Sequence, residues 1–155
     1  MNKQLAIIVD IDETLCTCFE VPVEAGIDTL SQIDEEKIQV HYVTSRTTVC
    51  VVTTERFLEE HRLPGAKNVH FCPIETRSYD HKRRLHNALA QEFNVIASIG
   101  DSFEEEEASE AAGIPFIAVD PSHPAEAWSI LAQRIADLGT GTAIGRSAIV
   151  AKESP

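Results

Sequence analysis

The sequence has no long apolar run, and this absence argues against a protein that spans a membrane. No stretch approaches the roughly 18 consecutive apolar residues that a membrane helix requires. Near the beginning, the segment MNKQLAIIVDID places two aspartates inside what would have to be the apolar part of a secretory signal. We therefore expect a cytoplasmic protein that makes no contact with a membrane.

Basic residues are also scarce. The 155 residues include 13 Lys and Arg against 25 Asp and Glu, which gives a formal net charge of −12. Such a charge opposes sequence-independent binding to the phosphate backbone of nucleic acids. A nucleic-acid substrate would depend on a local basic patch, for which the best candidate is the run His81, Lys82, Arg83 and Arg84.

Cysteines are few and poorly spaced for a metal site. Cys16 and Cys18 form C-x-C rather than C-x-x-C, while Cys50 and Cys72 are isolated. This spacing gives little support to a zinc site. We expect reduced thiols, most of them buried.

The rest of the composition is typical of a soluble α/β protein. Apolar residues make up 43% of the chain and charged residues 25%. Hydrophobic patterning predicts strands at 5–9, 38–43, 68–72, 95–99 and 116–119. Helices are predicted at 26–33, 47–62, 79–93, 103–112 and 124–138. This alternation predicts a Rossmann-like three-layer sandwich around a parallel five-stranded sheet.

The length of the chain fits one globular domain. We expect this domain to occupy residues 1–138, and no internal repeat divides it. The remaining segment, 139–155, has three glycines and weak periodicity. We predict that it forms an extended or flexible tail.

The segment LAIIVDIDETL, residues 5–15, carries the clearest functional signal. Its five apolar residues predict a strand buried on both faces, which runs directly into Asp10 and Asp12. Carboxylates at the end of a buried parallel strand lie where open α/β sheets bind ligands, and there they need a partner. A hard cation such as Mg²⁺ is the simplest partner. The alternative is a solvated acidic turn in which Asp12 or Thr14 caps a helix.

Polar residues also follow two other predicted strands. Thr44, Ser45 and Arg46 come after strand 38–43, and Asp101 comes after strand 95–99. If both strands are neighbours of the first, these side chains face the same crevice as Asp10. Together they offer carboxylates for a cation and hydroxyls for a phosphate group.

The order of these motifs resembles that of a known family. Asp10 to Thr14, read as DIDET, resembles the DxDxT signature of the haloacid dehalogenase (HAD) superfamily of phosphohydrolases. The stretch GDSFEE resembles the GDSxxD motif of that family, with Glu105 at the place of its second Asp. The similarity extends over about residues 4 to 120. It implies a HAD-like fold without a cap domain, because neither usual insertion point leaves room for one.

The resemblance also implies a role for each matching residue. Asp10 would be the nucleophile, Asp12 the general acid and base, and Lys82 the cation that neutralises charge. The hydroxyl of Thr44 or Ser45 would bind the phosphate, and Arg46 is either a fork onto the substrate or a surface residue. The residues implied for Mg²⁺ are Asp10, Asp12 through its backbone carbonyl, Asp101, and Glu105 directly or through water.

These expectations define one main function and two alternatives. The main one is a Mg²⁺-dependent phosphatase that hydrolyses a small phosphomonoester through an aspartyl-phosphate. The first alternative is a phosphatase that trims nucleic-acid ends, like a polynucleotide 3′-phosphatase, which the net charge disfavours. The second is a HAD-like binding domain without catalysis. Without a cap domain, the active site would be an open cleft. Such a cleft would accept a large substrate or be covered by a neighbouring subunit of a homo-oligomer.

Overall fold

Five parallel strands form the central sheet of the computed structural model, which describes residues 2–144. The strands are β1 (Leu5–Val9), β4 (Ile38–Thr47), β5 (Val69–Cys72), β6 (Asn94–Gly100) and β7 (Phe116–Ala118). They lie in the order β5-β4-β1-β6-β7, and each neighbouring pair is parallel. The predicted parallel five-stranded sheet is therefore confirmed.

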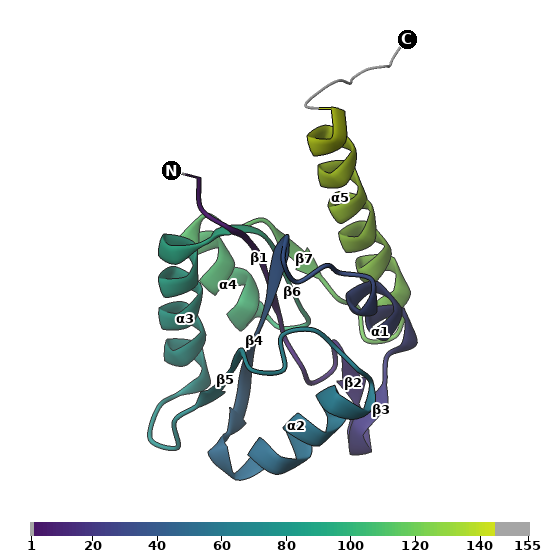
Figure 1. Cartoon of the computed structure of the whole chain (residues 1–155). Coiled ribbons are helices and arrows are strands. Elements are labelled where there is room, and N and C mark those ends of the chain that lie inside the picture. The colour runs from purple at the N-terminus through teal and green to yellow at the C-terminus, as the bar shows by residue number, and fades with distance from the viewer. Residues whose placement is uncertain (1, 145–155) are drawn as a thin grey trace.

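Helices cover both faces of this sheet (Figure 1). They are α1 (Glu24–Ser31), α2 (Val51–Glu60), α3 (Ser78–Glu92), α4 (Phe103–Ala112) and α5 (Pro124–Ile144), with 3₁₀ turns η1 (Cys18–Glu20) and η2 (Thr48–Cys50). Helices α3 and α4 lie side by side on one face, and α1 packs with α5 on the other. This arrangement confirms the predicted three-layer α/β sandwich.

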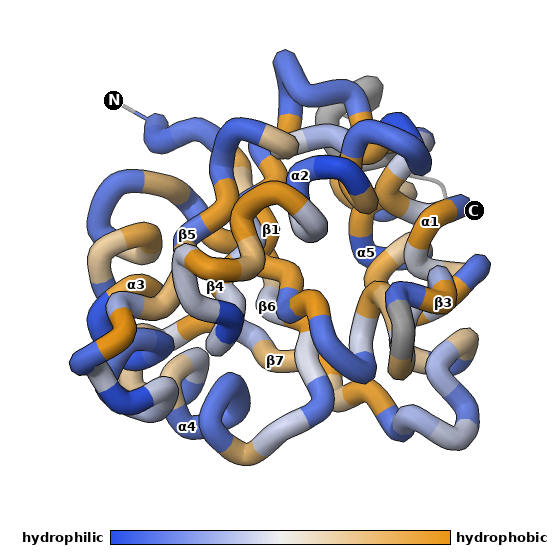
Figure 2. Tube along the Cα trace, turned by 90° about the horizontal axis from the view of Figure 1, so that it is seen from below, coloured by the Kyte–Doolittle hydropathy of each residue, from blue (hydrophilic) through white to orange (hydrophobic). Residues whose placement is uncertain are grey.

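Strand β1 lies at the centre because both of its faces are apolar. Ile7 packs into a core with Leu30 of α1 and Trp128 of α5. Ile8 points to the opposite face and packs with Leu89 of α3. The strands at the centre of Figure 2 are accordingly coloured as largely apolar. A strand that is buried on both faces shows a continuous apolar run instead of an alternating one.

The strand order decides where the predicted site residues meet. Strands β4 and β6 flank β1, so the carboxyl ends of all three lie at one edge of the sheet. Asp10 follows β1, Thr44 lies near the end of β4, and Asp101 follows β6. Both strands are therefore neighbours of β1, which is the condition for these side chains to face the same crevice as Asp10.

The connections near this edge hold small elements. A two-stranded antiparallel hairpin, β2 (Cys16–Thr17) and β3 (Val21–Pro22), follows β1 and precedes α1. Between β4 and α3 the chain forms η2, α2 and β5. Neither of these fully described connections contains a further domain.

Two ends in the middle of the chain differ from the predicted ones. Strand β4 continues to Thr47, because Thr47 still pairs with Cys72 of β5 beyond an irregularity in the register. The three residues that were expected to follow the strand therefore belong to its last part. The helix predicted from residue 47 begins as η2 and becomes α2 at Val51.

The last helix is longer than predicted. Helix α5 runs to Ile144 instead of ending at residue 138, so the extended tail predicted from residue 139 is wrong as far as residue 144. No proline interrupts this stretch, and a glycine such as Gly139 costs a helix only about 1 kcal/mol. The rest of the predicted tail, 145–155, lies outside the described residues. Among the residues that the structure describes, no helix has the length and apolar character needed to cross a membrane.

Candidate active site

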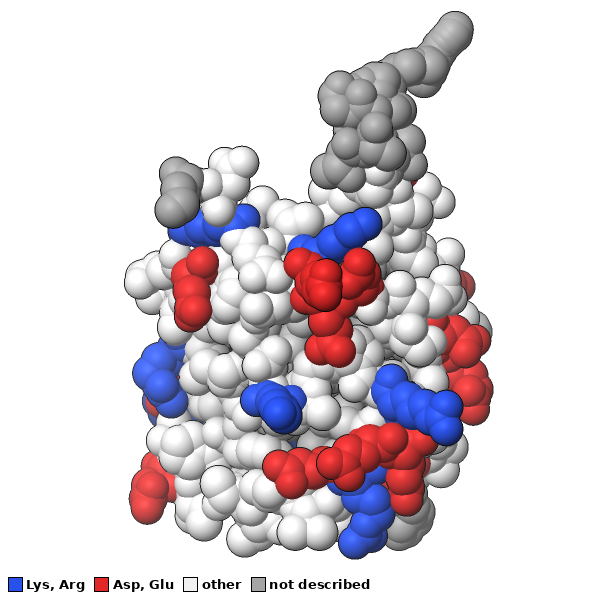
Figure 3. All heavy atoms as spheres, in the orientation of Figure 1, with Lys and Arg blue, Asp and Glu red and all other residues white. Residues whose placement is uncertain are grey.

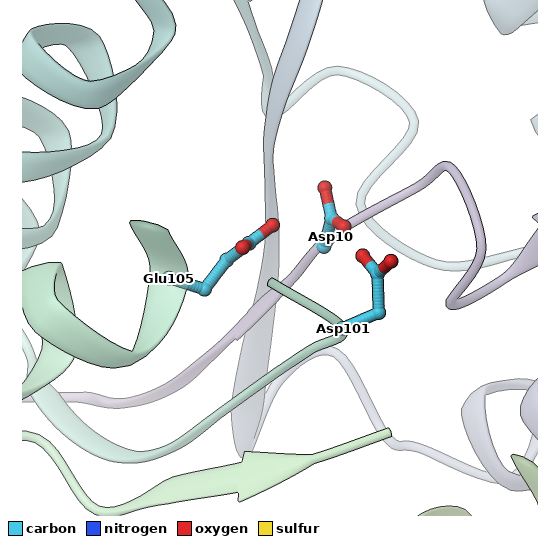
Figure 4. A group of neighbouring side chains, drawn as sticks. All are labelled: Asp10, Asp101 and Glu105. Atoms are coloured by element: carbon cyan, nitrogen blue, oxygen red, sulfur yellow. The ribbon is translucent and has the colours of Figure 1, made fainter. Parts of the chain in front are cut away.

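One buried cation and three carboxylates lie together at the carboxyl end of β1. We call Asp10, Lys82, Asp101 and Glu105 the inner group. Lys82 Nζ is 3.3 Å from Asp10 Oδ1 and also donates to Glu105 Oε1. Single carboxylate oxygens of Asp10, Asp101 and Glu105 lie within 4.8 Å of one another. Figure 4 shows these three side chains converging from three segments of the chain.

The backbone around Asp10 explains the position of its side chain. The N–H of Asp10 donates to the carbonyl of Ile99 in β6 at 3.0 Å, so the sheet holds this residue one step beyond β1. Thr14 Oγ1 donates to Asp10 Oδ2 at 3.3 Å. Helix α1 begins after Val23, so neither Asp12 nor Thr14 caps it. The alternative of an acidic turn with a helix cap does not describe this segment.

Glu105 reaches the inner group from the first turn of α4. Gly100 makes room for it, because a Cβ at this position would lie 2.8 Å from Glu105 Cγ. Ser102 precedes the helix, and its hydroxyl donates to Glu105 Oε2. The sequence S-x-x-E has the spacing of a capping box, in which the serine oxygen accepts a backbone N–H of the helix. Here the serine hydroxyl donates to the glutamate carboxylate instead.

Lys82 comes from the buried side of α3. Both His81 and Lys82 are almost fully buried, with exposed fractions of 1% and 2%. Arg83 lies over the ring of Tyr79, with its guanidinium carbon 5.6 Å from the ring centre. The basic run of residues 81–84 therefore does not form one surface patch, because half of it faces the interior. The expectation that this run forms a surface patch for nucleic acid is therefore wrong.

The inner group is short of positive charge. Burial raises the pKa of Asp10 well above its usual value; Lys82 opposes this shift and Glu105 adds to it. Burial lowers the pKa of Lys82, yet Asp10 and Glu105 together hold it above its usual value. Three carboxylates thus share one ammonium group. Because a divalent cation would supply the missing charge and prefers carboxylate oxygens, this donor set fits Mg²⁺.

A second cation lies between two further carboxylates. We call Asp12, Glu20 and Arg46 the outer group. Arg46 binds Asp12 through two N–H groups, from Nε to Oδ2 at 3.0 Å and from Nη2 to Oδ1 at 2.8 Å. Its Nη2 is also 2.9 Å from Glu20 Oε1, and Nη1 donates to Thr54 Oγ1 at 2.9 Å. The side chains of Asp12 and Glu20 are 53% and 38% exposed, so this group is partly open to water.

The fork predicted for Arg46 is thus made with a carboxylate of the chain itself. Its hydrogen bonds to Asp12 hold the pKa of Arg46 above its usual value, so the side chain is cationic. Cys16 Sγ lies 3.5 Å from Arg46 Nη2, but burial raises the pKa of Cys16 to about 12. A thiol with such a pKa stays protonated at neutral pH and is a poor nucleophile.

The two hydroxyl residues near the end of β4 differ in exposure. Thr44 is fully buried, and its Oγ1 accepts the backbone N–H of Arg46 at 3.0 Å. Ser45 is exposed. Which of them binds a phosphate group stays a prediction, as do the roles of the inner and outer groups.

Sequence reasoning missed three contacts of these groups. Glu20 and Thr54 both bind Arg46 from other elements, and no local pattern marks either residue, because such contacts join distant parts of the chain. The contact of Ser102 with Glu105 is different. The S-x-x-E spacing is a local signal that could have identified it.

Comparisons with known proteins show which solved structures have a similar fold. No protein-family model and no curated protein matches the sequence. A chain of the Pnkp1/Rnl/Hen1 RNA repair complex is similar in structure, with a TM-score of 0.63 and 14% identity over 76% of this chain and 42% of that chain. The class C acid phosphatase from Bacillus anthracis matches with a TM-score of 0.58 and 15% identity, over 88% and 80% of the two chains. Its structure with tungstate bound gives 0.56 and 15%, over 91% and 81%.

These similarities concern the fold. The chain has the α/β fold of HAD-like phosphatases, as the motifs led us to expect. It spans less than half the length of the RNA repair chain, so the match covers one part of that protein. At 14–15% identity, these similarities do not show that this chain has the activities of those proteins.

Proposed function

We propose that this chain is a Mg²⁺-dependent phosphomonoesterase of the small capless HAD-like type, with Asp10 as its nucleophile. The observation that carries the proposal is the inner group. A buried aspartate at the end of the central strand lies 3.3 Å from Lys82, and two further carboxylates can share a cation with it. The fold of the class C acid phosphatase supports the same reading.

The first step transfers the phosphoryl group to the protein. A carboxylate oxygen of Asp10 attacks the phosphorus, and the ester P–O bond breaks as the new O–P bond forms. Asp12 donates a proton to the departing alkoxide. Lys82 balances the negative charge that gathers on Asp10 and on the phosphoryl oxygens. Thr44 or Ser45 donates a hydrogen bond to one of those oxygens.

The second step returns Asp10 to its free form. Water attacks the aspartyl-phosphate, Asp12 accepts the proton of this water, and inorganic phosphate leaves. Arg46 acts indirectly in this scheme, because its two hydrogen bonds to Asp12 fix the orientation of that carboxylate. The partial exposure of Asp12 lets it exchange protons with solvent between turnovers.

The residues that would hold Mg²⁺ are the Asp10 carboxylate, the Asp12 carbonyl and Asp101, with Glu105 binding directly or through water. Bound there, the ion would offset the charge on the phosphoryl oxygens. The shortage of positive charge in the inner group supports this assignment.

A screen of phosphorylated metabolites tests the proposal, with wild type and Asp10→Asn compared with and without Mg²⁺. We expect phosphate release that depends on the divalent ion and disappears in the variant. Tungstate, which is bound in the similar acid phosphatase, should inhibit the activity competitively. Full activity of Asp10→Asn would remove Asp10 from the role of nucleophile.

Two alternative functions are outcomes of the same screen. The similarity to a chain of an RNA repair complex favours a phosphatase for nucleic-acid ends, and a 3′-phosphorylated oligonucleotide should then exceed free nucleotides as substrate. A binding domain without catalysis would release no phosphate and would form no beryllofluoride adduct at Asp10 in the presence of Mg²⁺. Of these possibilities we favour a small phosphorylated substrate. We also propose that the protein is cytoplasmic, and that a neighbouring subunit of a homo-oligomer covers the open active site.

A further inference from the structure

Both cations of the candidate active site are already matched by carboxylates of the chain. Arg46 lies between Asp12 and Glu20, with Nη2 within 2.9 Å of an oxygen of each. Lys82 lies between Asp10 and Glu105. A bound cation would compensate the inner carboxylates further, whereas in the outer group the single cation Arg46 faces the two carboxylates of Asp12 and Glu20. A second anionic group on the substrate would therefore meet the excess negative charge of the outer group.

Glu20 is held at this place by an unusual backbone. Its φ of 62° lies in the left-handed region, which is costly for a residue other than Gly, Asn or Asp. Glu20 ends η1, and β3 of the hairpin follows it directly. The base of the hairpin is closed by the hydrogen bond from the Val23 N–H to the Leu15 carbonyl at 2.8 Å. Local strain of this kind is often retained where a side chain must reach a functional site.

The surroundings of Arg46 add to this negative field. Helix α2 supplies Thr54 to Arg46, and its outward side carries the exposed Glu55, Glu59 and Glu60. The exposed charged residues of α2 also include Arg56, and Figure 3 shows acidic side chains over this part of the surface with basic ones beside them. A polyanion such as an oligonucleotide would approach the site past this surface.

Apolar side chains, by contrast, are exposed next to the residues of both groups. Phe103 is 64% exposed and begins α4 directly after Ser102, whose hydroxyl contacts Glu105. Val21 is 55% exposed and follows Glu20. Of the two, Phe103 lies next in the chain to the residue that contacts the inner group, so it is the apolar side chain available to a substrate there. An aromatic side chain such as Phe103 packs well against a flat apolar group.

Given the phosphatase function proposed above, we infer that the site prefers phosphomonoesters with an uncharged, apolar leaving group, and that Glu20 discriminates against esters that carry a second anionic group. Glu20 acts on binding and touches no reacting atom. Phe103 supplies the apolar contact for the leaving group.

A matched pair of substrates tests this specificity. Benzyl phosphate and 4-carboxybenzyl phosphate have leaving alcohols of similar reactivity and differ by one carboxylate. We expect wild type to favour benzyl phosphate by about tenfold in kcat/KM, with the difference in KM, because the carboxylate is repelled by Glu20. Glu20→Gln should lower KM for the carboxylated ester and reduce this preference to about twofold or less.

Two control variants separate this effect from general changes of charge or surface. Glu92→Gln removes the same charge at the exposed end of α3, next to the amino end of β6, and should keep the tenfold preference. Phe103→Ala should raise KM for benzyl phosphate, whereas Ile130→Ala, which truncates an exposed apolar residue of α5, should not. A purely structural role of Glu20 would lower kcat for both esters and leave their ratio unchanged.

The possible results distinguish the two proposals. If neither benzyl ester nor any other phosphomonoester releases phosphate, the proposed phosphatase function fails, and this inference fails with it. If phosphate is released but wild type prefers 4-carboxybenzyl phosphate or a 3′-phosphorylated oligonucleotide, the phosphatase stands and the inference is overturned. An unchanged preference in a Glu20→Gln protein whose circular dichroism matches wild type would overturn the role of Glu20.

Discussion

The inner and outer groups are each arranged around one cation but differ in their access to water, and the inner group also holds a third carboxylate, that of Asp101. In each, one cation contacts two carboxylates: Lys82 in the inner group and Arg46 in the outer. The side chains of Lys82 and Glu105 are each 2% exposed, whereas those of Asp12 and Glu20 are 53% and 38% exposed. Charges interact more strongly and are screened less by salt where water is excluded.

This difference assigns different tasks to the two groups. Removing one partner of a buried ion pair costs about 3–5 kcal/mol, whereas an exposed pair contributes about 0–1 kcal/mol. Disturbing the inner group is therefore costly, which agrees with the role proposed for it, the holding of charge during a reaction. The outer group can change a contact at little cost, which suits the recognition of a substrate and the exchange of protons.

The comparison of the two groups is tested most strongly by their aspartates. Asp10→Asn removes the proposed nucleophile and should reduce phosphate release by about 10⁴-fold, or about 5.4 kcal/mol in the barrier. Asp12→Asn removes the proposed general acid and should lower the rate of phosphate release by about 10²–10³-fold. A beryllofluoride adduct, followed by fluorine NMR with Mg²⁺, should form in Asp12→Asn and not in Asp10→Asn. Adduct formation in both variants would place the nucleophile elsewhere.

The second test removes the inner cation. Lys82→Met leaves the carboxylates of Asp10 and Glu105 buried without their partner, and the free energy of unfolding should fall by about 3–5 kcal/mol. Urea unfolding in the presence of EDTA measures this loss. Mg²⁺ should restore part of the stability, and so should Glu105→Gln in the same background. Equal urea midpoints for wild type and Lys82→Met would show that the inner group is not short of positive charge.

The third test concerns His86, which contacts the backbone of Lys82 and should make the stability of the protein depend on pH. His86 is fully buried; its Nδ1 donates to the Lys82 carbonyl at 2.8 Å, and its Nε2 lies 3.2 Å from Ser98 Oγ. Burial lowers the pKa of His86 to about 4, so between about pH 6.5 and 4 the unfolded chain binds a proton that the folded chain does not. The stability that His86 contributes is therefore complete above pH 6.5 and lost as the pH falls toward 4. We expect a loss of about 2–3 kcal/mol.

The control for this test is His86→Gln. Because it removes the titrating group, its free energy of unfolding should fall less steeply with decreasing pH than that of wild type. His41, whose pKa burial also lowers to about 4, contributes the same trend in both proteins. Parallel pH profiles of the two proteins would contradict the assignment to His86.

The smallest effect is expected in the outer group. Arg46→Lys keeps the charge but loses the two parallel hydrogen bonds to Asp12, and should cost about 1 kcal/mol or less of stability. Unfolding at low and high NaCl sharpens the contrast. Raising the salt should reduce the difference between Arg46→Lys and wild type, while the deficit of Lys82→Met should stay nearly constant. The reverse pattern would mean that the groups are not separated by access to water.

Local patterns were sufficient to predict most of the fold. The apolar run 5–9 matches β1, and the helix predicted at 103–112 matches α4, which ends at Ala112 and is capped by Gly113 with φ 74°. These signals depend on neighbouring residues, so a single sequence contains them. The end of β4 depends instead on its partner β5, and for that reason its extension to Thr47 was not predictable.

The candidate site was predictable in its parts and less so in its contacts. The spacing of Asp10, Asp101 and Glu105, together with the family resemblance, selected residues whose carboxylates do lie together. The contact of Arg46 with Glu20 was not foreseen, because it depends on how the hairpin folds back onto β4. The burial of Lys82 was hidden for a similar reason: α3 has a basic first half, and the sequence alone does not say which of its sides faces the sheet.

The strand order also bears on how the protein is made. The first strand of the chain occupies the middle of the sheet, yet one of its two neighbours, β6, ends only at Gly100. A nascent chain shorter than this leaves one side of β1 unpaired, and Asp10 without Asp101 and Glu105. The inner group is therefore complete only once the chain has been made as far as Glu105, and any shorter nascent chain lacks part of the candidate site. The same long-range pairing predicts slower folding than in helical proteins of equal length.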